Sequence, residues 1–281
     1  MDMSKWPVVC GIALLLLSAC KSGQQRTPYT PADEMAGDTI TTVSADSLEQ
    51  FGEGSRMPIA ADELFDDFFF NYAANKRLQL ERTTFPLPIL KDGKKESLTS
   101  KQWKMEYFFK EQDFYTLLFD SPQQMELVKD TAVDHAVVER IMLEKNVVCQ
   151  YQFNRRKGCW MLNEINYQPL PHNPNAQFFS FYQQFVSDSL FQHHSLSDQI
   201  AFVGPDPEDD FQMVEGFISP DSWDAFRPDF PVGELYNIVY GHQNPASTQK
   251  IFVIRGISNG LEVEVTFKLR NGKWKVVKLI T

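Results

Sequence analysis

The sequence lacks an apolar run that could cross a bilayer, and it lacks the compact signatures of common enzymes. Its longest apolar stretch, residues 8–17, is about half as long as the ~20 residues that a spanning helix requires. A Gly-x-Ser-x-Gly motif, a phosphate-binding loop and a dinucleotide fingerprint are all missing. The net charge is −10 and basic residues form no stripe. We therefore predict no transmembrane helix, no catalytic residue, no cofactor and no nucleic-acid partner.

Cysteine is also scarce, with four in the chain. Cys10 and Cys20 belong to the N-terminal segment, which leaves Cys149 and Cys159 for the folded part. A disulfide is allowed in an oxidising compartment, but the hairpin predicted below places these two far apart on neighbouring strands, a geometry that argues against one. We expect two buried free thiols.

The N-terminus has the pattern of an export signal. Lys5 precedes the apolar run, and Leu17-Ser18-Ala19 stand directly before Cys20. The sequence Leu-Ser-Ala-Cys resembles the bacterial lipobox, which implies a cleaved signal peptide over residues 1–19 and lipid on Cys20. An ordinary signal peptide with a chance cysteine is the alternative. Lys21 stands where an aspartate would signal retention in the inner membrane, so we expect a lipid anchor in the outer membrane, on either face.

Residues 20–56 are rich in Thr, Ser, Asp, Gly and Pro and contain few aromatic side chains. Such a segment buries too little apolar surface to offset the entropy lost on ordering. We predict a lipidated flexible tether here, followed by a folded body.

Internal repetition is the most informative feature of that body. Four blocks recur in the same order, and the spacing between partners changes only by loop lengths. The matched pairs are Phe65 with Phe178, Phe68 with Phe181, Phe69 with Tyr182, Tyr72 with Phe185, Trp103 with Trp223, Tyr115 with Tyr236, Phe153 with Phe267, Gly158 with Gly272 and Trp160 with Trp274. We predict two tandem domains, residues 57–171 and 172–281, called the first and second repeat below.

Each block predicts a local structure. The aromatic blocks at 65–72 and 178–185 have the three-to-four spacing of an amphipathic helix, and Asn173-Pro174 is a favourable start for the second one. Short helices capped by Thr99 or Ser219 are expected to carry the two tryptophans. Short buried strands follow at 113–119 and 234–240, and further strands at 133–143 and 250–257. Asn271-Gly272 and Lys157-Gly158 mark the turns of two closing hairpins.

This order predicts an α+β unit with helices on one face of a sheet. The Phe-rich first helix, the helix with Trp103 or Trp223 and the Gly158-Cys159-Trp160 and Gly272-Lys273-Trp274 turns resemble the nuclear transport factor 2-like (NTF2-like) fold, together with Arg82-Thr83-Thr84-Phe85-Pro86-Leu87. That resemblance implies two cone-shaped domains, each a curved antiparallel sheet around helices, packed as an intramolecular pseudo-dimer. Lipobox, tether and tandem domains together also resemble a bacterial lipoprotein family of unknown function.

Few residues suggest chemistry. Enzymes of the NTF2-like superfamily often use an Asp with a His or Tyr inside the cone, and Asp134-His135 is the nearest such pair. Adjacent residues of a strand face opposite ways, so these two cannot act together. Trp103 and Trp223 fit core packing best. Their alternative role is to line the mouths of the cones, so all four residues are pocket-lining candidates.

Two polar clusters contain residue types that bind metal ions. His194 and Asp198 would share one face of a helix beside His193, but no third ligand is placed by the sequence. The acidic run 206–210 lacks the alternation and the turn glycine of a calcium loop, and we expect Asp209 or Asp210 to cap a helix instead. No metal site is predicted.

The sequence therefore favours a non-catalytic binding or interaction module of the cell envelope, held at the outer membrane by its lipid. Its partner would be a small apolar ligand or an envelope protein. One alternative is an enzyme with a small apolar substrate, which requires two titratable groups converging in one cone. Another is a scaffold whose cones are filled by Phe and Trp.

Overall fold

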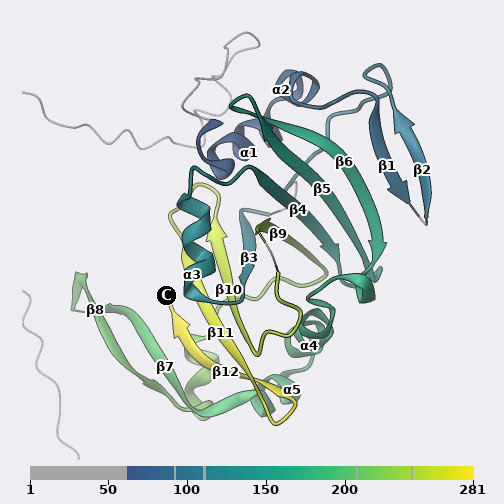
Figure 1. Ribbon diagram of the computed structural model, residues 1–281. Helices are drawn as coiled ribbons and strands as arrows, with labels where there is room; N and C mark the ends of the chain where they lie inside the picture. The colour runs from purple at the N-terminus through teal and green to yellow at the C-terminus, as the bar shows by residue number, and fades with distance from the viewer. Residues whose placement is uncertain (1–61, 92, 110–111, 207, 242) are drawn as a thin grey trace, which may run out of the picture. The chain divides into compact units, whose positions relative to one another are not determined.

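The computed structural model describes residues 62–281 except 92, 110–111, 207 and 242 (Figure 1). The predicted signal peptide, Cys20 and the tether lie outside the described residues. Within the described part, none of the helices combines the length and the apolar character needed to cross a membrane.

The first repeat contains two helices before its strands, and a short helical segment between β3 and β4. Its elements are α1 (Phe65–Ala74), α2 (Lys76–Glu81), β1 (Leu87–Lys91), β2 (Lys94–Leu98), β3 (Phe114–Phe119), α3 (Pro122–Met125), η3 (Glu126–Lys129), β4 (His135–Met142), β5 (Val147–Arg156) and β6 (Cys159–Pro169).

The second repeat has the same order of strands after its helices, but its short helical segments come before its third strand and not after it. Its elements are η4 (Leu170–His172), α4 (Ala176–Ser187), α5 (Ser189–His194), β7 (Leu196–Asp206), β8 (Asp209–Ile218), η5 (Pro220–Ser222), α6 (Trp223–Phe226), β9 (Glu234–Tyr240), β10 (Gln249–Gly256), β11 (Glu262–Arg270) and β12 (Lys273–Ile280).

The strands form two six-stranded mixed sheets with matching orders. Sheet A runs β2-β1-β6-β5-β4-β9, and sheet B runs β8-β7-β12-β11-β10-β3. The predicted closing meanders, β4-β5-β6 and β10-β11-β12, are confirmed. Each sheet also contains a parallel pair, β1 with β6 and β7 with β12. Both meanders shift register at the same place in the repeat, between Gln152 and Phe153 and between Thr266 and Phe267.

The two repeats exchange a strand, which the sequence analysis did not anticipate. Strand β9 of the second repeat pairs with β4 of the first, and β3 of the first repeat pairs with β10 of the second. Figure 1 shows β9 beside β4 and β3 beside β10. Where the two exchanged strands meet, Leu118 N donates to Asn237 Oδ1 at 2.9 Å and Thr116 Oγ1 donates to Tyr236 O. Each sheet is therefore completed by the other repeat.

Aromatic side chains hold α1 and α4 to their sheets in the same way. In the first repeat, Phe65 lies 5.3 Å from Phe153 and 4.8 Å from Trp160 between ring centroids. The equivalent distances from Phe178 to Phe267 and to Trp274 are 5.3 and 5.4 Å. The predicted amphipathic helices are confirmed, because their matched aromatic side chains contact matched positions on the two sheets.

Several local predictions need correction. Helix α4 begins at Ala176, because Asn173 Oδ1 accepts from Asn175 N in a turn before the helix. Around Thr99 the chain forms one hydrogen-bonded turn, with Thr99 O accepting from Trp103 N at 3.1 Å, where a helix was expected.

The acidic run near residue 209 does not start a helix. Asp209 begins β8, which pairs with β7 in a projecting hairpin (Figure 1). Strand pairing satisfies the backbone there, so local capping preference is overridden.

The two cysteines of the body are free, as expected. Cys149 is buried and lies opposite Tyr167, whereas Cys159 is half-buried and lies opposite Arg156 at the far end of the β5-β6 pair.

Candidate functional site

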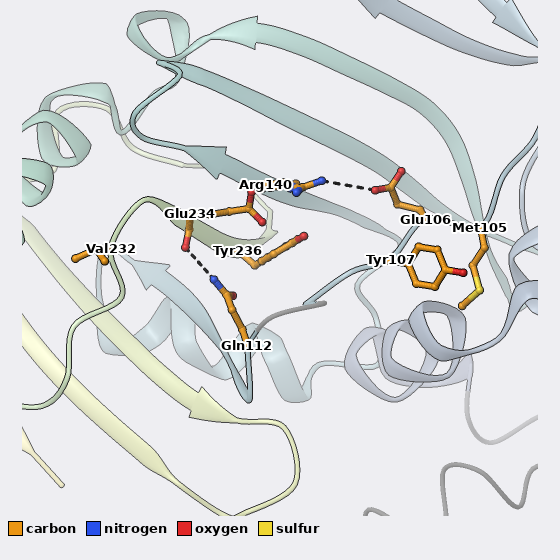
Figure 2. A pocket seen from close by; sticks show the side chains of 8 residues that line it. All are labelled: Met105, Glu106, Tyr107, Gln112, Arg140, Val232, Glu234 and Tyr236. Atoms are coloured by element: carbon orange, nitrogen blue, oxygen red, sulfur yellow. Dashed lines mark hydrogen bonds and ion pairs between the residues drawn. The ribbon is translucent and has the colours of Figure 1, made fainter.

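A pocket of about 530 Å³ opens beside the inner face of sheet A, the face that packs against α1 (Figure 2). Both repeats build it. The first repeat contributes the segment after Trp103 and strand β4, and the second contributes the start of β9. The lining residues are Met105, Glu106, Tyr107, Gln112, Arg140, Val232, Glu234 and Tyr236. Its volume falls within the roughly 300–1,000 Å³ of small-molecule sites.

An arginine between two glutamates is the main charged feature of the pocket. Arg140 Nε lies 3.0 Å from Glu234 Oε2, and Arg140 Nη1 lies 3.8 Å from Glu106 Oε1. Figure 2 shows Arg140 between the two carboxylates, which reach it from opposite sides. Strand pairing accounts for the closer contact, because Glu234 stands at the start of β9 and Arg140 near the end of β4, two positions apart in the register. Strand exchange therefore supplies the nearer partner of Arg140.

Glu106 is the less compensated of the two acids. Burial raises the pKa of Glu106 above its ordinary value, although a hydrogen bond from Tyr151 and the charge of Arg140 act in the opposite direction. The side chain still keeps 30% of its surface exposed. A group with these properties can exchange a proton or an ionic partner with a ligand.

The remaining lining side chains divide into a buried floor and an exposed rim. Tyr236 is 2% exposed and lies below the pocket, whereas Tyr107 and Val232 are 59% and 66% exposed at its mouth. Gln112 Nε2 donates to Glu234 O at 3.0 Å. Its Oε1 is buried without a hydrogen-bond partner in the described part of the chain. This oxygen is an unused acceptor, and a ligand in the pocket would reach it only after the Gln112 side chain turns.

Sheet B has no such charged group at the equivalent positions. Counting from the matched pair Phe153 and Phe267, the registers place Ile254 where sheet A has Arg140. Ile254 pairs with Thr116 as Arg140 pairs with Tyr236. By the same count, Glu234 corresponds to Phe114.

These registers correct one match made from sequence. The sequence blocks match Tyr115 with Tyr236. Equivalent residues of the two sheets should face the two different cores, but both of these side chains belong to the core around α1. Because neighbouring residues of a strand face opposite sides, the equivalent of Tyr236 is Thr116, one position further along.

Trp103 and Trp223, two of the pocket-lining candidates, pack in or against the cores. Trp223 is fully buried, and its Nε1 donates to Gln192 Oε1 at 3.1 Å. Trp103 is half-buried, and its ring centroid lies 5.9 Å from that of Phe85. Neither lines the pocket of Figure 2.

Asp134 and His135 are both exposed and lie outside the pocket. The backbone oxygen of Asp134 accepts from Arg155 N at 2.7 Å, and His135 Nδ1 lies 2.9 Å from Asn154 Oδ1. The residues that do converge are Glu106, Arg140 and Glu234. One signal in the sequence was available, namely the charged pair Glu139-Arg140 inside a strand that is otherwise apolar.

The expectation that His194 and Asp198 share one face of a helix is wrong. Helix α5 ends at His194, and Asp198 lies in β7. His193 Nε2 instead contacts Asp224 Oδ2 at 3.1 Å. Among the described residues, no three His, Cys, Asp or Glu side chains are placed to hold a metal ion.

Comparison with solved structures defines the class of protein. The chain is similar to an NTF2-like protein from Bacteroides fragilis NCTC 9343 known from a 2.15 Å crystal structure, with 39% identity and a TM-score of 0.73 over 80% of this chain and 98% of that one. The fold is therefore α+β and NTF2-like. The chain belongs to the family described as "Domain of unknown function (DUF4348)", whose model matches residues 44–281. No curated protein gives a match.

Proposed function

We propose that this protein is a non-catalytic binding module of the cell envelope, which holds a small molecule in the pocket of sheet A and is anchored to the outer membrane through lipid on Cys20. One observation carries the ligand-binding part. Sheet B presents Ile254, Phe114 and Thr116 where sheet A presents Arg140, Glu234 and Tyr236. The fold therefore forms without the charged group, and burying charges costs stability unless they are paired. Retaining them in one repeat fits a role in binding.

An enzyme is the second candidate, and the same pocket favours it. Glu106 has a raised pKa, Arg140 lies 3.8 Å away and Tyr151 donates to Glu106. Two or more titratable groups in one pocket are what acid–base catalysis requires. Binding and catalysis differ in whether the captured molecule leaves unchanged.

A fragment screen on the full chain, read by thermal shift and by crystal soaks, tests the proposal. Val232→Trp should fill the mouth of the pocket and abolish the shifts, because Val232 is 66% exposed there. Leu190→Trp is the matched control, since Leu190 is 72% exposed on α5. Mass spectrometry of each hit after incubation should return it unchanged. Fragments that bind equally to the Val232→Trp variant would refute a site in this pocket, and a converted fragment would establish the enzyme.

The anchor has an independent test. Cells fed an alkyne-tagged fatty acid should label the wild-type chain and leave Cys20→Ser unlabelled, with the wild-type protein in the outer-membrane fraction. Labelling of the Cys20→Ser variant, or release of the wild-type protein with periplasmic contents, would contradict the proposed lipid anchor.

A further inference from the structure

We propose that the ligand of this pocket is a small primary amine, whose ammonium group binds among Glu106, Glu234 and Gln112 and whose apolar part lies against Met105, Tyr107 and Val232. This inference rests on the proposed function and adds the chemical class of the ligand. The eight side chains of Figure 2 carry it, through their charge, their hydrogen-bonding capacity and their shape.

The charge of the lining favours a cation. Of the eight lining residues, two are carboxylates and one is a guanidinium, which leaves one negative charge in excess. Arg140 is already paired with Glu234 at 3.0 Å. An anionic ligand would have to share the guanidinium with that carboxylate and would be repelled by both glutamates. A cation would instead be attracted to the two carboxylates.

Glu106 provides the position for the ammonium group. It lies 3.8 Å from Arg140, which is a loose contact beside the 3.0 Å contact of Glu234. Because burial raises the pKa of Glu106, a further cation would favour its ionised form. Figure 2 shows its carboxylate group directed toward Arg140.

Hydrogen bonding distinguishes a primary amine from a quaternary ammonium ion. Gln112 Oε1 is buried and accepts no hydrogen bond from the described part of the chain. The two carboxylates add further acceptors, whereas Arg140 directs its charge toward the glutamates. An ammonium with three N–H donors complements an acceptor-rich site, and a group without N–H donors would leave these acceptors unsatisfied.

The rim indicates an apolar part next to the ammonium. Tyr107 and Val232 are more than half exposed beside a pocket of about 530 Å³. An alkyl or aryl group against them would remove apolar surface from water. The aromatic face of Tyr107 can also interact with a cation.

Three probes of equal carbon chain test the ligand class on the full chain. Calorimetric titration with n-hexylammonium, 1-hexanol and hexanoate compares positive, neutral and negative head groups. We expect n-hexylammonium to bind at least about tenfold more tightly than 1-hexanol, since charge-assisted hydrogen bonds contribute roughly 1.5–3 kcal/mol. Hexanoate should bind most weakly.

Variants locate the effect. Glu106→Gln should weaken n-hexylammonium binding by about tenfold and weaken 1-hexanol binding by less. Glu96→Gln is the matched control, because Glu96 is exposed on β2 and the substitution removes the same charge outside the pocket. Lowering the pH should weaken n-hexylammonium binding to the wild type, and the Glu106→Gln variant should lack most of this dependence.

The inference is overturned if hexanoate or 1-hexanol binds as tightly as n-hexylammonium, or if Glu106→Gln leaves the amine affinity unchanged. If 1-hexanol or hexanoate binds and Val232→Trp abolishes that binding, the proposed small-molecule pocket is still supported. If the fragment screen finds nothing that Val232→Trp excludes, the proposed function itself fails.

Discussion

Asn237 Nδ2 donates a hydrogen bond to Glu139 Oε2 at 3.0 Å, across the junction where β9 of the second repeat pairs with β4 of the first. Glu139 is fully buried, and among the described residues its hydrogen-bond donors are side-chain amides. Two further amides donate to its other oxygen, Gln150 Nε2 at 2.9 Å and Asn173 Nδ2 at 2.8 Å. One carboxylate therefore ties the exchanged strand, sheet A and the segment before α4 together.

Removing this carboxylate should destabilise the whole body. In Glu139→Ala three amides lose their acceptor, two of them on the buried residues Asn173 and Asn237, so we expect the free energy of unfolding to fall by about 3 kcal/mol or more. Glu139→Gln keeps one acceptor oxygen and should cost less. Urea denaturation measures both. Glu144→Ala, at an exposed position just after β4, should change stability by no more than about 0.5 kcal/mol. A loss in Glu139→Ala as small as in that control would mean that the network does not hold the repeats together.

Much of the fold was accessible from the sequence because local patterns encode it. The spacing of Phe65, Phe68, Phe69 and Tyr72 specifies one face of a helix whatever surrounds it. Asn271-Gly272 favours a tight turn through its own backbone preferences, and Asn271 has a φ of 51° there. These features depend on neighbours in the chain and not on distant partners.

The strand exchange was not accessible in this way. Strands β3 and β9 have similar apolar patterns, so either could pair with β4 or with β10 on the strength of pattern alone. A slip of one residue reverses which side chains face a core, and the sequence match of Tyr115 with Tyr236 contained such a slip. The pocket was missed for the same reason. Arg140 and Glu234 are distant in sequence and meet only because β9 crosses to the first repeat.

The contrast between the two sheets can be tested by converting one into the other. Arg140→Ile removes the cation between Glu106 and Glu234, and Glu234→Phe removes the nearer partner of Arg140. The double variant reproduces the pair Ile254 and Phe114 of sheet B. We expect the double variant to lose less unfolding free energy than the two single variants lose together, by roughly 1 kcal/mol. Urea denaturation of all four proteins gives this coupling energy.

A second ion pair serves as the reference for that cycle. Arg77 and Glu81 are 2.8 Å apart on α2 with more than half of each side chain exposed. Their coupling, measured with alanine variants, should not exceed about 0.5 kcal/mol. An Arg140–Glu234 coupling no larger than this would show that the pocket residues do not act as a unit.

The two thiols should differ in reactivity. Burial raises the pKa of Cys149 to about 11, so its reactive thiolate is nearly absent at neutral pH. Cys159 is half-buried at the β5-β6 turn. Iodoacetamide at neutral pH should modify Cys159 in the folded protein and reach Cys149 only after unfolding, as read by peptide mass spectrometry. Equal modification of both in the folded protein would contradict the burial of Cys149.

Asp66 makes the stability of the body depend on pH. It lies on α1, accepts a hydrogen bond from the Tyr240 hydroxyl of β9, and its Oδ2 is 3.9 Å from Arg255 Nη1 of β10. Burial raises the pKa of Asp66 from 3.8 to about 6, against the lowering effects of Tyr240 and Arg255. The folded protein therefore holds this proton more tightly than the unfolded chain does.

The sign of the effect follows from that difference in proton affinity. The stability that Asp66 contributes is fully present below pH 3.8 and is lost as the pH rises through about 6. At about 1.4 kcal/mol for each pKa unit, the loss is on the order of 3 kcal/mol. Urea denaturation of the wild type and of Asp66→Asn should therefore show a difference that changes by this amount between pH 4 and pH 7. Asp67→Asn, an exposed neighbour on the same helix, should follow the wild type closely. A constant difference between the wild type and Asp66→Asn across that range would mean that Asp66 is ionised at its ordinary pKa in the folded protein.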